Sequence, residues 1–181
     1  MPESLLGKAL LTVAASGLVA VCAHVSLPLP FTPVPLTLQT FAVVLVGMLL
    51  GPVAGFSAMA LYLAEGAAGL PVFSPQGPGG VLQLMGPTGG YLLSYPLAAA
   101  AAGAVVRSLR PVASRFARGV LAGAAGSAVF LACGAAWLAH VLHASAAATW
   151  TMAVLPFLPG EAIKIAAAAG MYGSMQRAKR F

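Results

Sequence analysis

The sequence has very few charged residues. Nine Lys and Arg and three Asp and Glu occur among 181 residues, so that 7% of the chain is charged and 60% is hydrophobic. So few charged side chains do not cover the surface of a soluble domain of this size. An ordinary soluble protein is therefore excluded, and lipid is the expected solvent for most of the outer surface.

Disulfide frameworks and metal sites also lack the residues they need. The two cysteines, Cys22 and Cys133, lie in apolar runs, which favours buried free thiols over a disulfide. His24, His140 and His143 fall near the ends of apolar segments without any spacing typical of metal ligands. We interpret these histidines as interfacial, and we expect neither a metal nor a cofactor.

Apolar segments bounded by Pro, Gly and charged residues predict an all-α membrane protein with six transmembrane helices in a compact bundle. A helix crosses a bilayer in about 20 residues. The N-terminal segment has features of a signal peptide, but the remainder is equally hydrophobic, so we expect it to be retained as the first span. Residues 1–181 then form a single integral-membrane domain. The predicted spans are Leu5–Leu27, Leu36–Leu50, Val53–Leu70, Gly90–Leu109, Ala117–Leu142 and Met152–Met175.

All basic residues except Lys164 fall at or beyond span ends on one side of the predicted membrane. Lys8, the loop from Arg107 to Arg118 and the tail from Arg177 share that side, and the opposite loops contain no Lys or Arg. Loops rich in Lys and Arg remain in the cytoplasm. The sequence therefore predicts a multi-pass protein of the cytoplasmic (inner) membrane with both termini cytoplasmic. The net charge of +6 reflects this topology and does not indicate nucleic-acid binding.

An acid and a base near the outer end of the last span are the strongest indication of function. Glu161 and Lys164 share one helix face, and the preceding Pro159-Gly160 suits the start of a helical turn. Charged side chains at membrane depth are costly unless they pair or meet a polar ligand. We predict a ligand site; the alternative is a pair that only neutralises itself and fixes helix packing.

Two loops on the predicted outer side are unusual. Residues 28–35 carry four prolines in eight positions, which indicates either a stiff strap over a pocket or a stiff connector. Residues 69–91 form a long glycine-rich loop of the kind that often acts as a lid. We expect an outward-open, mostly apolar pocket for a compact ligand with one anionic group. Its polar residues are Thr37, Gln39, Gln76, Gln83, Thr88, Tyr91, Glu161 and Lys164, set among Phe31, Phe73 and Phe157.

Five short motifs follow one another along nearly the whole chain. They are residues 33–40 (PVPLTLQT), 47–52 (GMLLGP), 69–73 (GLPVF), 86–91 (GPTGGY) and 158–164 (LPGEAIK). In this order and spacing they resemble the BioY family, the biotin-specific substrate-binding (S) components of energy-coupling factor (ECF) transporters. The resemblance implies a six-helix bundle that binds biotin with high affinity in an outward-facing pocket and has no ATPase activity of its own.

The resemblance also implies roles for individual residues. Glu161 is expected to accept hydrogen bonds from the ureido N–H groups of biotin, and Lys164 to bind a ligand oxygen of the ureido carbonyl or of the carboxylate. The family usually has Asp where this chain has Glu161, and the extra methylene displaces the carboxylate by about one bond length. Glu65, near the outer end of the third span, is interpreted as a snorkelling or loop-tethering carboxylate.

Partners are implied as well. S components of this type dock on a transmembrane coupling protein with two ATPase subunits through small residues of the first helix. A ridge of small residues allows close helix approach in lipid, either to a partner or within the bundle. A similar ridge on the fifth span, at Gly119, Gly123 and Ser127, favours packing within the bundle. The candidate docking ridge on the first span consists of Thr12, Ser16 and Ala20.

Other functions remain open at this stage. The chain could be a self-sufficient biotin transporter without ATPase partners, or an S component for another small vitamin such as thiamine or riboflavin. A lone Lys164 disfavours the cationic thiamine. An intramembrane enzyme is a weaker alternative, because residues 55–58 (GFSA) have Ala58 where the serine motif of rhomboid proteases requires glycine. No inverted repeat supports a secondary transporter or channel.

Overall fold

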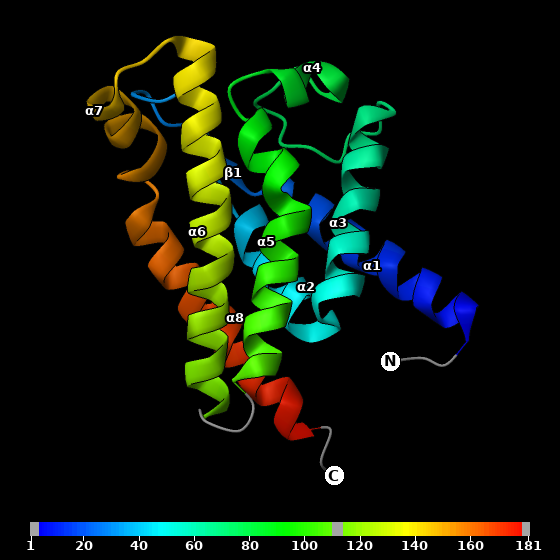
Figure 1. Cartoon of the computed structure of the whole chain (residues 1–181). Coiled ribbons are helices and arrows are strands. Elements are labelled where there is room, and N and C mark those ends of the chain that lie inside the picture. The colour runs from blue at the N-terminus through cyan, green and yellow to red at the C-terminus, as the bar shows by residue number, and fades with distance from the viewer. Residues whose placement is uncertain (1–3, 110–113, 179–181) are drawn as a thin grey trace.

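The computed structural model describes residues 4–109 and 114–178, which fold into a helical bundle (Figure 1). Each of the six predicted spans overlaps one of its longer helices, α1, α2, α3, α5, α6 or α8. The elements are α1 (Leu5–His24), β1 (Ser26–Leu27), β2 (Leu36–Thr37), α2 (Gln39–Leu50), α3 (Pro52–Ala67), α4 (Gly80–Met85), α5 (Gly89–Ser108), α6 (Arg115–Leu142), α7 (Ala146–Thr149), the π-helix η1 (Trp150–Val154) and α8 (Leu158–Ala178).

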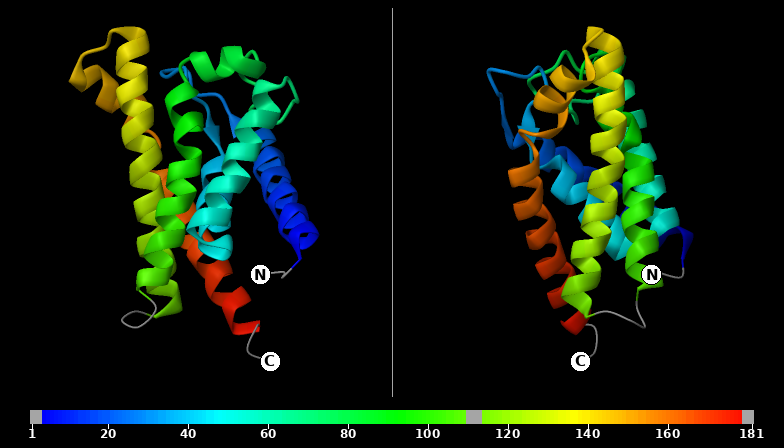
Figure 2. Two further views of the ribbon diagram at one scale, coloured as in Figure 1. Left: turned by 45° about the vertical axis from the view of Figure 1, so that its right-hand side comes forward. Right: turned by 60° about the vertical axis from the view of Figure 1, so that its left-hand side comes forward.

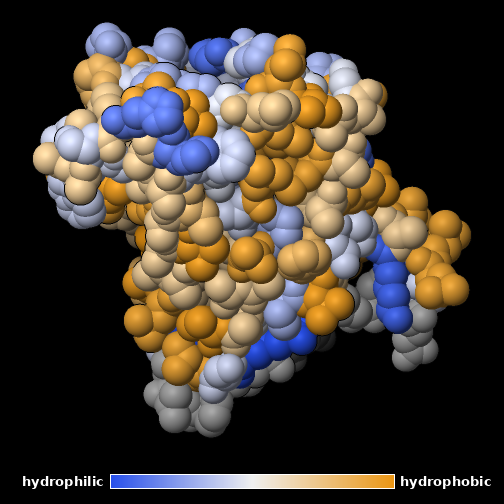
Figure 3. Space-filling view, turned by 45° about the horizontal axis from the view of Figure 1, so that its top comes forward, coloured by the Kyte–Doolittle hydropathy of each residue, from blue (hydrophilic) through white to orange (hydrophobic). Residues whose placement is uncertain are grey.

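Within the described residues, three helices are long and apolar enough to cross a membrane, namely α1, α5 and α6. The segment from α7 through η1 to α8 qualifies as a fourth, bent by 43°, if it is counted as one span. The helices α2 and α3 are shorter, with 12 and 16 residues, and only Gly51 lies between them. Gly51 has φ +86°, a conformation that favours glycine. Large apolar side chains cover much of the surface, as expected for contact with lipid (Figure 3).

The prediction of an all-helical chain is wrong in one place. The first predicted span extends to Leu27, but α1 ends at His24 and residues 26–27 pair antiparallel with residues 36–37. The chain reverses at a turn of residues 30–31, where the N–H of Thr32 donates to the carbonyl of Leu29, so the flanking residues can form a short ladder. The last predicted span begins at Met152, whereas α8 begins at Leu158 after η1.

The centre of the bundle is α5, which packs against α2, α3 and α6. Small residues permit this close packing. A Cβ on Gly47 of α2 would lie 2.2 Å from the carbonyl oxygen of Ala99, and one on Gly103 of α5 would lie 2.5 Å from the carbonyl carbon of Gly51. Any side chain at Gly47 or Gly103 would therefore force these helices apart.

The ridge predicted on the fifth span lies between α6 and α8, which confirms packing within the bundle. A Cβ on Gly119 would lie 2.7 Å from Cα of Ala169, and one on Gly123 would lie 3.0 Å from Cγ2 of Ile165. One turn further along α6, the hydroxyl of Ser127 donates to Glu161. The close approach of α6 to α8 thus brings a polar partner to the acid.

The bundle has two chemically different ends. Figures 1 and 2 show that the start of α1, the end of α5, the start of α6 and the end of α8 lie at the same end. We call it the basic end, because Lys8, Arg107, Arg115, Arg118 and Arg177 belong to these segments. The β-hairpin, α4 and the starts of α5 and α8 lie toward the opposite end (Figure 2), which we call the pocket end.

Candidate ligand-binding pocket

A cavity with an empty volume of about 490 Å³ lies at the pocket end. Its wall combines the hairpin strap, the starts of α2, α5 and α8, the middle of α6 and the loop around α4. The residues that line it are Val34, Pro35, Thr37, Gln39, Thr40, Ser74, Gln83, Thr88, Tyr91, Leu92, Tyr95, Phe130, Leu131, Phe157, Glu161 and Lys164.

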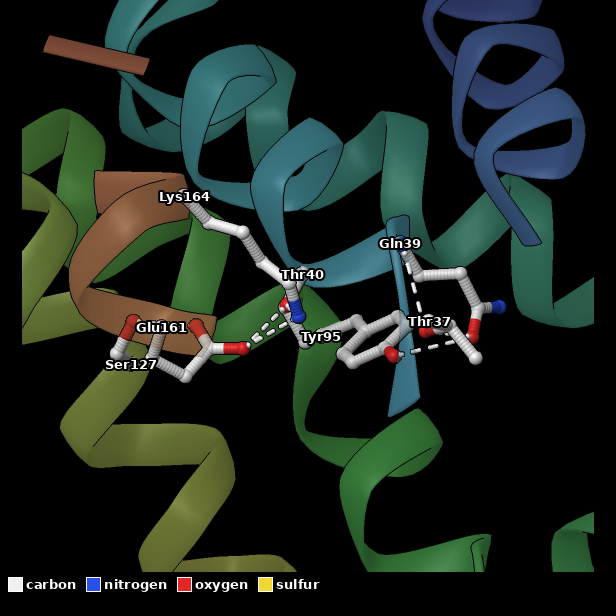
Figure 4. A network of polar contacts seen from close by, with 7 residues as sticks. All are labelled: Thr37, Gln39, Thr40, Tyr95, Ser127, Glu161 and Lys164. Carbon is white, nitrogen blue, oxygen red and sulfur yellow. Dashed lines mark hydrogen bonds and ion pairs between the residues drawn. The ribbon is translucent and has the colours of Figure 1, made fainter. Parts of the chain in front are cut away.

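Glu161 is held by donors from three helices (Figure 4). Its Oε1 accepts from the hydroxyl of Thr40 on α2 at 2.7 Å and from Nζ of Lys164 on α8 at 2.8 Å. Its Oε2 accepts from Ser127 of α6 at 3.2 Å. The residue is only 4% exposed. Such burial is tolerable for a carboxylate because it is both paired with a cation and hydrogen-bonded.

Lys164 retains unused hydrogen-bonding capacity. Its Nζ donates to Thr40 Oγ1 at 3.0 Å and to Glu161 Oε1, which accounts for two of its three N–H donors. Lys164 also lines the cavity and is less buried than Glu161, with its side chain 11% exposed. The third donor is available to an oxygen atom of a ligand.

A second polar group without charge lies at the start of α2. The side-chain amide of Gln39 donates to the Tyr62 hydroxyl, and its Oε1 accepts from Thr37 at 3.1 Å and weakly from Tyr95 at 3.5 Å. Tyr62 in turn donates to the carbonyl of Val72 at 2.9 Å. Gln39, Thr37 and Tyr95 line the same cavity as Glu161 (Figure 4). The cavity therefore offers a charged anchor and a neutral one.

Aromatic and apolar side chains line the same cavity. The ring of Tyr91 lies 6.1 Å from that of Phe157, and its hydroxyl donates to the carbonyl of Ala153 in η1 at 2.6 Å. Gly134 of α6 makes room for Tyr91, since a Cβ there would lie 2.3 Å from the ring. Phe130 packs edge-on against Tyr95. This wall suits an apolar ring or chain of a ligand.

The loop between α3 and α5 closes one side of the cavity. Gln83 of α4 donates to the carbonyl of Ser74 at 3.3 Å and accepts from the N–H of Gly79 at 3.1 Å, which folds the loop on itself. The hydroxyl of Ser74 donates to Gln76, and Gln76 also accepts from Ser26 in β1. The loop is thus attached to the β-hairpin.

Most of the expected pocket residues are brought together. Three of the predicted side chains lie outside the cavity. Phe31 is 57% exposed at the tip of the proline strap, Gln76 joins Ser26 to Ser74 at the surface, and Phe73 packs against Gly66 in the core. The residues that do line the cavity are Thr37, Gln39, Gln83, Thr88, Tyr91, Phe157, Glu161 and Lys164.

Sequence reasoning missed several residues of the site. Tyr95 lies one helical turn after Tyr91, and this i,i+4 spacing was a usable signal. Thr40 adjoins Gln39, but its contact with Glu161 depends on how α2 approaches α8. Ser127 and Ser74 carried no signal of their own, because serine is common in membrane helices and loops.

The candidate docking ridge on α1 requires a correction. Ser16 is fully buried and donates to Glu65 of α3, so it faces the bundle and not an external partner. Thr12 and Ala20 are partly buried, and the Thr12 hydroxyl donates to its own helix at Lys8. Glu65 does not line the cavity, which agrees with a tethering role.

The cysteines and histidines lie outside the cavity. Cys22 and Cys133 are free thiols. His24, His140 and His143 are exposed, outside the cavity. In the part of the chain that the structure describes, no three His, Cys, Asp or Glu side chains are grouped to hold a metal ion.

Comparison with known proteins identifies the family. The model of the BioY family matches residues 2–181. The biotin transporter BioY of Thermotoga maritima is 38% identical over 154 residues, which is 85% of this chain and 86% of the relative. The probable biotin transporter BioY of Pyrococcus horikoshii is 38% identical over 136 residues, 75% of this chain and 76% of the relative.

The fold has a solved counterpart. A crystal structure of the S-component for biotin from an ECF-type ABC transporter superposes with a TM-score of 0.87 and 23% identity, covering 98% of this chain and 95% of that chain. The match of fold, the match of sequence over most of the length and the motifs around the cavity agree. The chain belongs to the BioY family.

Proposed function

We propose that this chain binds biotin from the outside and takes it up across the cytoplasmic membrane as the S component of an ECF-type transporter. In this arrangement six spans cross the membrane, both termini and the basic end are cytoplasmic, and the pocket end faces out. A transmembrane coupling protein and two ATPase subunits supply the energy. The relatives named above as biotin transporters support the substrate.

The observation that carries this proposal is that one cavity holds a charged anchor, a neutral polar anchor and an apolar wall. Biotin has the complementary groups: a ureido ring with two N–H donors and one carbonyl, an apolar thiophane ring and a carboxylate at the end of an aliphatic chain. The unused donor of Lys164 suits a biotin oxygen. Gln39, Thr37 and Tyr95 suit the hydrogen-bonding groups at the other end of the ligand.

The structure sharpens the role expected for Glu161. Its oxygens already accept three hydrogen bonds, whereas an ionised carboxylate has about four lone-pair sites. One ureido N–H can therefore be accepted without displacing a partner, and a second displaces Thr40 or Ser127. The side chain of Glu161 is one methylene longer than that of Asp, and its carboxylate accepts hydrogen bonds from the hydroxyls of Thr40 on α2 and Ser127 on α6.

The direct test is calorimetric titration of the detergent-purified chain, alone, with biotin, biotin methyl ester, thiamine and riboflavin. We expect tight one-to-one binding of biotin and none of thiamine or riboflavin. A methyl ester bound as well as biotin would assign Lys164 to the ureido oxygen, and a large loss would assign it to the carboxylate. Binding of another vitamin in place of biotin would overturn the substrate.

The partner requirement needs a separate test in cells that lack any other biotin transporter. We expect labelled biotin uptake to depend on co-expression of a coupling protein and its ATPases, and to be lost with an ATPase variant that cannot hydrolyse ATP. Full uptake by the chain alone would establish a self-sufficient transporter and contradict the ECF assignment.

A further inference from the structure

An open groove lies at the basic end, away from the biotin pocket. It runs between the starts of α1 and α3 and the ends of α2 and α5, with an empty volume of about 760 Å³. The start of α1 diverges from the bundle there (Figure 2) and projects as an apolar arm at the right of Figure 3. The groove contains two cationic side chains, Lys8 and Arg107.

Arg107 is fixed in this groove. Its Nη2 donates to the carbonyl of Leu50 at 3.2 Å, which satisfies the end of α2. The guanidinium lies against Gly51, where a Cβ would be 1.9 Å from Nη2. A guanidinium has five N–H donors. Most of them remain available to an anion, and the group does not have to be ordered before it binds one.

No carboxylate of the described residues neutralises this pair of cations. Glu161 is paired with Lys164 at the pocket end, and Glu65 accepts from Ser16. Within residues 4–109 and 114–178, neither Lys8 nor Arg107 has an ion-pair partner. Two cations lining one groove attract an anion.

The rest of the groove is suited to hydrocarbon. Leu11, Leu50, Val53 and Ala54 line it, and Val53 is 77% exposed. The two hydroxyls in the wall are satisfied within their own helices, because Thr12 donates to Lys8 at 2.9 Å and Ser57 donates to Val53 at 3.0 Å. They leave no free donor, so acyl chains can lie against them without loss.

We propose that this groove binds one anionic phospholipid, with the phosphate between Lys8 and Arg107 and an acyl chain along Leu11, Leu50 and Val53. Basic pockets between membrane helices at the cytoplasmic side bind anionic lipid headgroups. The proposal rests on the orientation proposed above, in which the basic end lies at the cytoplasmic headgroups. It is independent of the biotin pocket, which lies at the opposite end.

Native mass spectrometry of the delipidated full chain tests this proposal. Phosphatidylglycerol and phosphatidylcholine with the same acyl chains are added in equal amounts to wild type, Lys8→Gln and Arg115→Gln. Arg115→Gln is the matched control, because it removes one positive charge from the same end but outside the groove. We expect one phosphatidylglycerol per chain, preferred about tenfold over phosphatidylcholine, with the preference reduced at least fivefold by Lys8→Gln and less than twofold by Arg115→Gln.

Each other outcome contradicts the proposal. Equal losses in the two variants would show general attraction to a basic surface, and no preference for phosphatidylglycerol would exclude the site. Competition by millimolar glycerol 3-phosphate would show a free-phosphate site without acyl contacts. Retained biotin binding by Lys8→Gln checks its folding, and a second variant, Ala54→Leu, narrows the groove without a charge change and should also weaken lipid binding.

Discussion

The two acidic side chains in the described helices have very different surroundings. Glu161 is 4% exposed, accepts from a lysine and two hydroxyls, and lines a cavity. Glu65 is half-buried, accepts from Ser16 across the α1–α3 interface, and lies away from the cavity. Glu161 and Glu65 both occur in apolar sequence. The cost of burying a carboxylate therefore does not by itself distinguish a residue that binds a ligand from one that joins two helices.

The decisive difference is the partner and the space beside it. Lys164 neutralises Glu161, retains one further N–H donor and lines the cavity, whereas the hydroxyl of Ser16 donates to Glu65 away from the cavity. A membrane carboxylate with a cation and an adjoining cavity can exchange one partner for a ligand. A carboxylate that accepts from a hydroxyl between two helices, as Glu65 does, stabilises only the packing of those helices.

The largest expected effect is from Lys164→Ala. The substitution removes the ammonium group that donates to biotin, and it leaves Glu161 buried without its ion pair. Biotin affinity should therefore fall at least 100-fold, about 2.7 kcal/mol. Equilibrium binding of labelled biotin to purified protein measures this. Lys164→Arg controls for charge. An affinity of the alanine variant within threefold of wild type would show that Lys164 does not bind the ligand.

The next effect is from Glu161→Gln. The amide keeps the shape but loses the charge, and it offers one acceptor oxygen where the carboxylate has two, so the donors from Thr40, Lys164 and Ser127 cannot all be satisfied. Biotin affinity should fall about tenfold, roughly 1.4 kcal/mol. The same binding assay applies, with Glu161→Asp as the second variant. Glu161→Asp should retain more affinity than Glu161→Gln if the charge matters more than the reach.

A smaller effect distinguishes the two tyrosines of α5. The Tyr95 hydroxyl contributes a weak bond to Gln39 in the cavity, so Tyr95→Phe should lower biotin affinity about threefold with little change in thermal stability. Tyr91→Phe leaves the buried carbonyl of Ala153 without its donor and should lower stability by about 1 kcal/mol. Thermal unfolding and biotin titration of both variants test this prediction. A loss of affinity in Tyr91→Phe and a loss of stability in Tyr95→Phe would contradict it.

The smallest effect on binding is expected from Glu65→Gln. The amide oxygen can still accept from Ser16, so biotin affinity should stay within twofold and the melting temperature should fall slightly. Ser16→Ala is the matched variant on α1 and should behave alike. If Glu65→Gln weakened biotin binding as much as Glu161→Gln, the contrast between the two acids would be wrong.

Much of the helical pattern follows from the sequence, because lipid demands long apolar segments with internal hydrogen bonds. Span ends were less certain. The stretch after His24 is apolar enough to continue α1, yet the chain reverses at residues 30–31 and the residues on either side of that segment pair as strands. Near Met152 the chain forms a π-helix, which composition does not distinguish from an α-helix.

The site was predictable where spacing along one helix determines it and not where separate helices meet. Glu161 and Lys164 share a face by their i,i+3 spacing alone. The contact of Thr40 and Ser127 with Glu161 depends on the approach of α2 and α6 to α8. Phe73 was misplaced because nothing in the sequence indicates that Gly66 leaves a gap in the core for its ring.

The most direct test of the central claim is a double-mutant cycle of Glu161→Gln and Lys164→Ala, measured by calorimetric titration with biotin. If the two residues form one ligand anchor, the double variant should bind about as well as Lys164→Ala alone, with a coupling energy above about 1 kcal/mol. Fully additive losses, or wild-type affinity in the double variant, would contradict the account.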